Sequence, residues 1–112
     1  MQYALLIYID PDAGSDLNED ERAAVTAEYL DIRADPRNRG GAHLSPVETA
    51  TTVRIVDQQP LITDGPFADT KEVFGGFYLF EADDLDSALE IAKRVPAAST
   101  GGAVEIRPIA MM

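Results

Sequence analysis

Cysteine is absent from this sequence of 112 residues, and histidine occurs only once, as His43. Without cysteine the chain forms no disulfide, no thiolate nucleophile and no zinc–thiolate site, and one histidine excludes a multi-histidine metal centre within a single chain. Long apolar runs are also missing: the longest has about seven residues, where a membrane span needs roughly 20. We therefore expect a cytoplasmic protein with no membrane partner.

Positive charge is scarce. Lys and Arg total 9 against 20 Asp and Glu, which gives a net charge of -11 at pH 7. A field of that sign repels phosphate backbones, so we expect no nucleic acid partner. The remaining composition, with 46% hydrophobic and 26% charged residues, is typical of a globular protein. The length fits one domain, residues 1–112.

The N-terminal segment predicts a buried strand followed by an acidic turn. Residues 3–9 (YALLIYI) are apolar at consecutive positions, and the sequence DPDAG after them ends the strand. The acidic residues between positions 10 and 21 suggest a calcium site, but Asp10, Asp12, Gly14 and Asp16 do not fit the spacing of a calcium-binding loop. We therefore expect no metal there.

A helix is predicted over about residues 19–34. Asn18, followed three residues later by Glu21, has the pattern of a capping box. Pro36 together with the glycine pair at 40–41 is expected to end the helix.

Several later segments have strand patterns. They are a short strand at 43–46, a half-buried strand at 51–56 with a return arm at 61–63, a strand at 74–81 and a last strand at 103–109. A second helix begins after Asp84 as its cap and ends before Pro96. Its apolar stripe is expected to comprise Leu85, Ala88, Leu89, Ala92 and Val95.

The order of these elements predicts an α+β fold, a ferredoxin-like split βαβ arrangement with two helices on one face of an antiparallel sheet. The strands at 3–9 and 77–80 are nevertheless apolar on both sides. An antiparallel sheet covered on one face alone should alternate, so a further layer must cover the second face. The economical cover is the same face of another copy, which predicts a two-fold homodimer through the sheet face.

The sequence DGPFADTKE at 64–72, followed by GGFY at 75–78, resembles the signature of the DGPF proteins within the YCII-related family. The resemblance continues in ATTVR at 50–54 and VEIRP at 104–108, so it spans nearly the whole chain. It implies the ferredoxin-like fold and assembly as a dimeric α/β barrel. It implies no settled activity, because the wider superfamily includes small cofactor-free isomerases, monooxygenases and haem-binding enzymes.

Two positions depart from the family. Asp69 stands where the signature usually has Glu, which shortens the side chain by one methylene. Other YCII-like proteins resemble enzymes with a His–Asp pair whose His lies on the first helix. The predicted helix at 19–34 has no His, so this pair is not transferred.

Three residues are the candidates for catalysis: His43, Asp64 and Lys71. His43 is the one side chain that ordinarily titrates near neutral pH, although a lone His is more often structural. Asp64 begins a turn that explains it equally well. Lys71 is one of two lysines in the chain and suits an anionic ligand, with a surface ion pair as the alternative.

Four residues are expected to border a ligand pocket near the signature: Arg54, Phe67, Thr70 and Glu72. Arg54 is also expected to share a polar sheet face with Glu105 and Arg107, where these charges either line a cavity or form an ion-pair cluster.

Two functions follow as alternatives. One is a cofactor-independent enzyme, or a binder, of a small molecule, an anionic one included, with no cofactor required. The other is a non-catalytic regulatory or interaction module, since DGPF proteins are often associated with genes for ECF-type sigma factors. A polar pocket beside Lys71 favours the first, and an exposed apolar patch favours the second.

Overall fold

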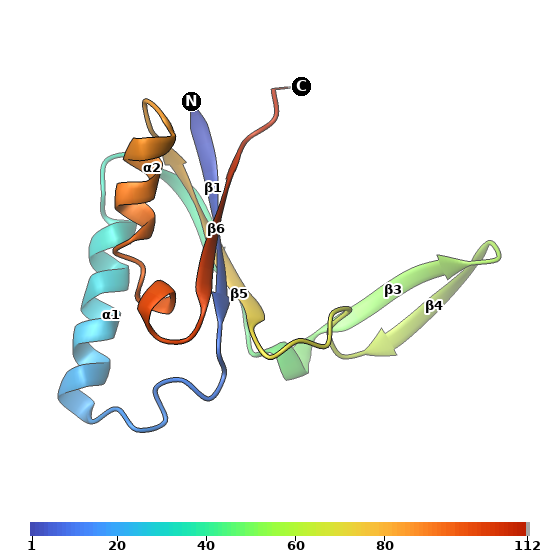
Figure 1. The fold of residues 1–112 in the computed structure, drawn as a ribbon. Helices are drawn as coiled ribbons and strands as arrows, with labels where there is room; N and C mark the ends of the chain where they lie inside the picture. The colour runs from blue at the N-terminus through green and yellow to red at the C-terminus, as the bar shows by residue number, and fades with distance from the viewer. Residues whose placement is uncertain (112) are drawn as a thin grey trace.

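A computed structural model describes residues 1–111 and has the expected α+β architecture, with an antiparallel sheet, two helices and a separate hairpin (Figure 1). The strands are β1 (Gln2–Ile9), β2 (Asn38–His43), β3 (Thr51–Val56), β4 (Gln59–Asp64), β5 (Val73–Glu81) and β6 (Ala103–Pro108). The helices are α1 (Glu19–Arg33) and α2 (Leu85–Ala92), and short 3-10 turns follow β2 and α2. No helix within residues 1–111 combines the length and apolar character that spanning a bilayer requires.

The main sheet has the strand order β2-β5-β1-β6, and every neighbouring pair is antiparallel. Both helices lie on the same side of this sheet (Figure 1). The core between them is built from alternate residues of the central strands, including Leu5 and Phe80, which are fully buried. The predicted placement of two helices on one sheet face is confirmed.

Both helices begin where the capping residues predict. The Asn18 side chain accepts a hydrogen bond from the Glu21 amide at 2.8 Å and Glu21 reaches back to the Asn18 amide, which completes the capping box. Asp84 caps α2 through the Ser87 amide at 2.8 Å.

The apolar stripe predicted for α2 is partly wrong. Leu85 and Leu89 are 50% and 38% exposed, whereas Ile91, outside the predicted stripe, is 2% exposed. The short helix turns Ala88, Ile91 and Ala92 toward the sheet, so the two leucines fall on its outer side.

The predictions around β2 are also corrected. The strand covers Asn38–His43 rather than 43–46, and the glycine pair at 40–41 lies inside it rather than ending α1. Gly41 has a φ of 150°, and a Cβ there would lie 2.2 Å from the Phe77 carbonyl oxygen. Glycine thus allows β2 to approach β5 closely, a use that the sequence pattern did not distinguish from a helix stop.

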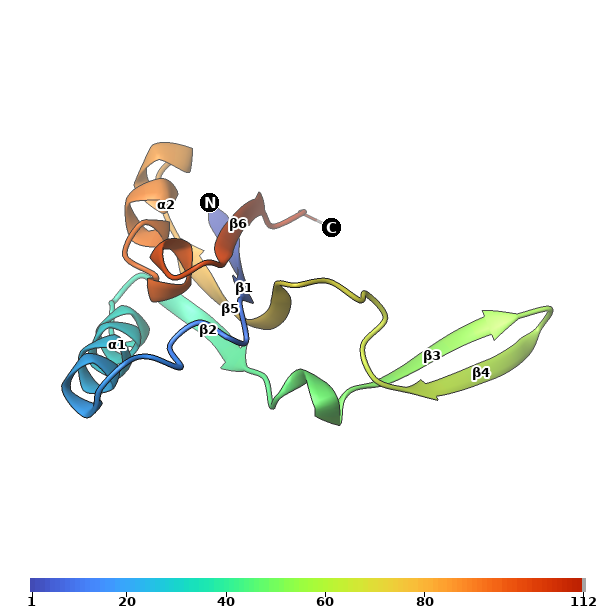
Figure 2. The same cartoon turned by 60° about the horizontal axis from the view of Figure 1, so that its bottom comes forward.

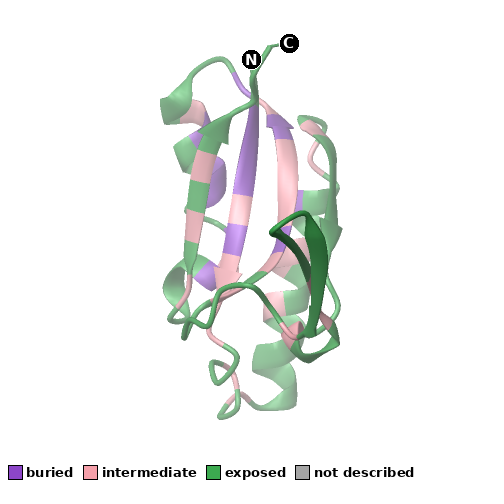
Figure 3. Ribbon diagram, turned by 90° about the vertical axis from the view of Figure 1, so that its right-hand side faces the viewer, coloured by how far each residue is buried: buried purple, intermediate pink, exposed green. Residues whose placement is uncertain are grey.

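The second face of the sheet has no cover within residues 1–111. Because side chains alternate along a strand, Leu6 and Tyr8 of β1 point away from the helices, and they pair with Phe77 and Phe74 of β5. The Tyr8 and Phe74 rings lie 5.5 Å apart. Leu79 of β5, opposite Ala4, completes what we call the open sheet face, onto which Figure 3 looks.

β3 and β4 form a hairpin that pairs with no strand of the main sheet. We call residues 51–64 the arm, and it projects from the side opposite the helices (Figures 1 and 2). The radius of gyration is 16.0 Å, where a compact domain of this length has about 13 Å.

The turn of the arm is a two-residue loop whose residues, Asp57 and Gln58, have φ values of 51° and 67°, as a type I′ hairpin turn requires. The strand at 51–56 was expected to be half-buried, and this is wrong. Val53 and Ile55 are 63% and 68% exposed, because the hairpin leaves the body of the protein.

Candidate functional site

A cavity of about 770 Å³ lies between α1 and the β2–β5 edge of the sheet. This volume is in the range that binds small organic molecules. The lining residues come from four elements: Ile7, Ile9, Thr26, Tyr29, Leu30, Arg33, Asn38, Gly40, Gly41, Ala42, His43, Gly75, Gly76, Phe77 and Tyr78.

Glycines form the floor of this cavity. The register of β1 against β5 shifts between Ile7, which faces Gly76, and Tyr8, which faces Phe74, so Gly75 is the extra residue of a bulge. At Gly76 a Cβ would lie 2.5 Å from the Ala42 carbonyl oxygen. The backbones of β2 and β5 therefore approach closely, and a Cβ at Gly40 would meet no atom within 4 Å.

Tyrosines form part of the wall. The Tyr78 hydroxyl donates to the Tyr29 carbonyl oxygen at 3.3 Å, which ties β5 to α1. Burial raises the pKa of both Tyr29 and Tyr78 above the usual value. Both phenols therefore stay neutral at physiological pH and offer flat, largely apolar surfaces to a ligand.

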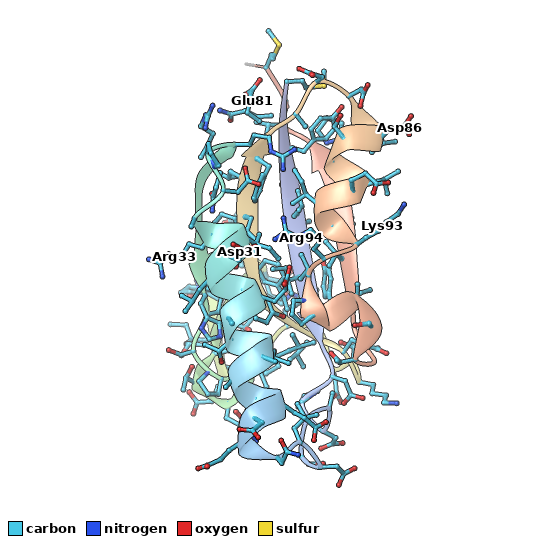
Figure 4. All side chains as sticks on the ribbon, turned by 90° about the vertical axis from the view of Figure 1, so that its left-hand side faces the viewer. Asp31, Arg33, Glu81, Asp86, Lys93 and Arg94 are labelled. Carbon is cyan, nitrogen blue, oxygen red and sulfur yellow. The ribbon has the colours of Figure 1, made fainter. Side chains whose placement is uncertain are left out.

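Arg33 and His43 are the basic residues that line the cavity, and no Asp or Glu of residues 1–111 lines it. Arg33 lies in the last turn of α1 and extends away from the core on the β2 side (Figure 4). Asn38 fixes the junction of α1 and β2, because its amide donates to the Arg33 carbonyl oxygen at 3.0 Å and its oxygen accepts from the Gly40 amide at 2.8 Å.

The carboxylates closest in sequence to this junction are paired elsewhere. Arg94 of the segment after α2 binds Glu28 at 3.1 Å and Asp31 at 2.6 Å (Figure 4). Asp35 binds Arg37 at 2.8 Å, and the hydrogen bond from that guanidinium lowers the pKa of Asp35 from 3.8 to about 2. These pairings neutralise negative charge around the cavity in a strongly acidic chain.

A second hollow, of about 430 Å³, lies at the root of the arm. Its lining includes Phe67, Thr70 and Glu72 of the signature loop together with the Tyr8 and Phe74 rings of the open sheet face. Within the loop, the Thr70 hydroxyl donates to the Glu72 carbonyl oxygen. This hydrogen bond ties the Thr70 side chain to the backbone of the loop, and the hollow is mainly apolar.

The structure does not bring the seven candidate residues into one site. His43 lines the cavity, whereas Phe67, Thr70 and Glu72 line the second hollow. Lys71 lines neither: its side chain is 73% exposed, and its ammonium group lies 3.8 Å from an Asp10 carboxylate oxygen.

The remaining candidates lie on the arm. Asp64 ends β4, paired opposite Thr51. The Arg54 guanidinium lies 5.6 Å from the centre of the Phe67 ring, in a cation–π contact. The shared polar face expected for Arg54, Glu105 and Arg107 is therefore wrong for Arg54, since the other two lie on β6 of the main sheet.

The sequence interpretation missed Arg33, Asn38 and Tyr78. The signal that pointed to them is the presence of two glycine pairs, at 40–41 and 75–76, in segments with strand character. Paired glycines on adjacent strands leave a side-chain-free floor, and the helix end above it supplies the polar groups. Within residues 1–111 no three His, Cys, Asp or Glu side chains are grouped so that they could hold a metal ion.

The comparisons with known proteins agree in placing this chain. The family described as the YCII-related domain matches residues 1–112. An uncharacterised protein of Rhizobium meliloti (strain 1021) is 37% identical over 120 residues, which cover 99% of this chain and 94% of that protein.

Among solved structures, 5-chloro-2-hydroxyhydroquinone dehydrochlorinase from Burkholderia phenoliruptrix AC1100, in complex with 2,5-dihydroxybenzoquinone, matches with a TM-score of 0.52. The identity is 19%, over 98% of this chain and 94% of that chain. This likeness shows the shared fold.

Proposed function

This chain belongs to the YCII-related family, and on that premise we propose that it binds a small aromatic molecule with an acidic group in the cavity between α1 and β2. One observation carries the proposal. The chain has 20 Asp and Glu and a net charge of -11, yet the described lining of the cavity has no carboxylate and includes Arg33 and His43. Such an arrangement favours an anion where the rest of the surface repels it.

The walls and the floor suit a flat ligand. Tyr29, Leu30 and Tyr78 supply apolar and aromatic surface, and the glycine floor leaves room for a ring. The acidic group of the ligand would then lie toward Arg33 and His43. A hydrogen bond to a charged group contributes about 1.5–3 kcal/mol, so Arg33 would account for a large share of the affinity.

The same groups support proton chemistry without a cofactor. In its neutral form the His43 imidazole would accept the proton of an acidic hydroxyl, and the Arg33 guanidinium would stabilise the oxyanion left on the ligand. The fold neighbour bound to 2,5-dihydroxybenzoquinone makes an acidic hydroxyquinone a sensible first probe.

The protein is further proposed to act as a homodimer through the open sheet face, assembled as a dimeric α/β barrel. The accessible surface is 8037 Å², whereas a compact monomer of 12.1 kDa exposes about 6,000 Å². An excess of about 2,000 Å² is more than one side of a standard interface needs, which is about 800 Å². The half-buried Leu6, Phe77 and Leu79 of the open sheet face supply part of the apolar surface.

The test is calorimetric titration with benzoate, benzamide and 2,5-dihydroxybenzoquinone. Benzoate and benzamide are similar in shape and differ in charge, so we expect benzoate to bind at least tenfold more tightly. Arg33→Gln should weaken benzoate binding by about 10- to 100-fold. Arg39→Gln is the matched control, because Arg39 lies on β2 outside the cavity lining and the substitution changes the net charge equally.

Three results would contradict the proposal. Equal binding of benzoate and benzamide would remove the anion selectivity, and equal losses in Arg33→Gln and Arg39→Gln would reduce the effect to net charge. Loss of binding in Lys71→Ala with Arg33→Gln unaffected would move the ligand to the signature loop, which is the site that the sequence alone predicts.

An interaction module remains the second candidate function, and the exposed apolar arm is the observation that favours it. In that case the arm would bind a protein partner, such as a segment of an ECF-type sigma factor, and the cavity would bind none of the three probes.

A further inference from the structure

We propose that the arm of each protomer clasps the sheet edge of a second copy, with the face formed by Val53, Ile55 and Ile62 against the partner. This inference rests on the sheet-face homodimer proposed above and adds a second, separable contact to it. It is independent of the ligand cavity.

One face of the arm is apolar but packs against nothing within its own chain. Val53 pairs directly with Ile62, and Ile55 with Pro60, so these four side chains share one face. Val53, Ile55 and Ile62 are 63%, 68% and 67% exposed. A lone two-stranded hairpin is marginally stable in water, so this ribbon needs a cover.

The other face of the arm is already partly occupied. Arg54 and Thr52 point to that face, opposite Leu61 and Thr63. The Phe67 ring of the signature loop lies beside Arg54 at 5.6 Å, and the Thr52 hydroxyl donates to the Gly65 carbonyl oxygen at 2.7 Å. These contacts fix the root of the arm and leave the Val53 face for the partner.

The direction and the length of the arm indicate that a second copy of the chain covers its apolar face. Figures 1 and 2 show the arm on the side of the sheet away from the helices, where a copy packed on the open sheet face would lie. Packed sheets are about 10 Å apart, and a six-residue strand extends about 20 Å. The arm therefore reaches past the partner's sheet along its edge.

The arm also lies beside the sheet rather than over its centre. It leaves the body after β2 and returns before β5, so its root is at the β2–β5 side of the sheet. In Figure 3 it rises toward the viewer at one side and leaves the centre of the open sheet face uncovered. A partner can therefore occupy the open sheet face while the arm flanks it.

Charge supports contact between two copies at this point. Residues 51–64 contain one Arg and two Asp, so the arm contributes little to the net charge of -11. Two acidic bodies repel each other, and a nearly neutral arm is the part of the chain that approaches the partner with least repulsion.

The experiment compares Ile62→Asp with Thr63→Asp. The two residues are neighbours on β4, both are exposed, and they point to opposite faces of the arm. We expect Ile62→Asp to raise the dimer dissociation constant at least tenfold in sedimentation experiments, because it buries an unpaired carboxylate. Thr63→Asp should change it less than threefold, and far-UV circular dichroism should show both variants folded.

A second measurement uses the absence of cysteine in the chain. Ile55→Cys carries the sole thiol, so a solvent-sensitive fluorophore attached there reports the environment of the arm alone. Its emission should shift to the blue over the concentration range in which sedimentation detects the dimer. It should not shift in the same labelled protein carrying Tyr8→Asp, which removes the sheet-face contact.

The outcomes separate the arm from the dimer and from the cavity. A wild-type protein that is monomeric at every concentration would remove both the dimer and the arm contact, without bearing on ligand binding. A dimer that tolerates Ile62→Asp, with no emission shift, would overturn the arm contact while keeping the sheet interface.

Discussion

The body of the protein, which is the main sheet with its two helices, buries its large apolar side chains, whereas the arm exposes them. Ile91 in α2 is 2% exposed and packs in the core, whereas Ile62 in the arm is 67% exposed. The body is held together by its own packing and surrounds a ligand-sized cavity. The apolar side chains of the arm pack against almost nothing in their own chain, so only contact with another molecule explains why they are apolar. Apolar character alone therefore does not distinguish a core residue from an interface residue.

The largest expected effect comes from placing a charge on each of the two faces of the main sheet in turn. Phe80→Asp places an unpaired carboxylate in the core and should abolish folding, because such a charge costs several kcal/mol. Tyr8→Asp places the same group on the open sheet face, so the protein should fold and become monomeric. Circular dichroism and sedimentation measure the two effects. A folded Phe80→Asp protein, or a dimeric Tyr8→Asp protein, would contradict the assignment of the faces.

A matched pair of truncations compares body and arm directly. Ile91→Ala should lower the free energy of unfolding by about 2–5 kcal/mol at every protein concentration, since it opens a cavity in the core. Ile62→Ala should cost less than about 0.5 kcal/mol in dilute protein. Its cost should increase with concentration as the dimer forms. Urea unfolding at several protein concentrations tests this, and equal losses in both variants at low concentration would refute the comparison.

Asp35 gives the body of the protein a pH-dependent contribution to stability. Its folded pKa of about 2 is below the ordinary 3.8, so its stabilising effect is complete above pH 3.8 and is lost as the pH falls through 2. Asp35→Asn should therefore lower the free energy of unfolding by about 1–2 kcal/mol at pH 7, and the difference should shrink as the pH falls and vanish below the folded pKa of about 2. Asp16→Asn, at an exposed position in the loop before α1, is the control. A loss that does not depend on pH would show that the Arg37 contact is not its source.

The smallest effect concerns the turn of the arm. Gln58 has a φ of 67°, a conformation that glycine adopts without strain. Gln58→Gly should stabilise the hairpin by about 0.5 kcal/mol and slow amide hydrogen exchange in β3 and β4 by about twofold. Gln59→Gly, in extended backbone, should accelerate exchange instead. Faster exchange in both variants would mean that the turn is not strained.

The sequence predicted those elements whose signals are local. The Asn18–Glu21 capping box and the apolar run in β1 depend on residues a few positions apart, and both appear in the structure as expected. The glycines at 40–41 misled the interpretation, because a helix stop and a close strand approach demand the same residue. Only the β2–β5 pairing, which joins distant segments, distinguishes the two.

The candidate site was predicted less well for the same reason. The sequence identified His43 from its chemistry and the signature loop from its resemblance. The cavity instead joins His43 to Arg33 and Tyr78, which lie 10 and 35 positions away in sequence. Their proximity follows from α1 packing over the β2–β5 edge, which no pattern within a single segment encodes.

The most direct test of the proposed ligand site uses the single histidine. Its imidazole C–H signals in a proton–carbon NMR spectrum belong to His43 without further assignment, because no other histidine is present. Titration with 2,5-dihydroxybenzoquinone should shift these signals, together with amide signals of the glycine floor at 40–41 and 75–76, and leave the arm at 51–64 unchanged. Shifts confined to the arm or to the signature loop at 64–72, with the His43 signals unmoved, would contradict the cavity as the binding site.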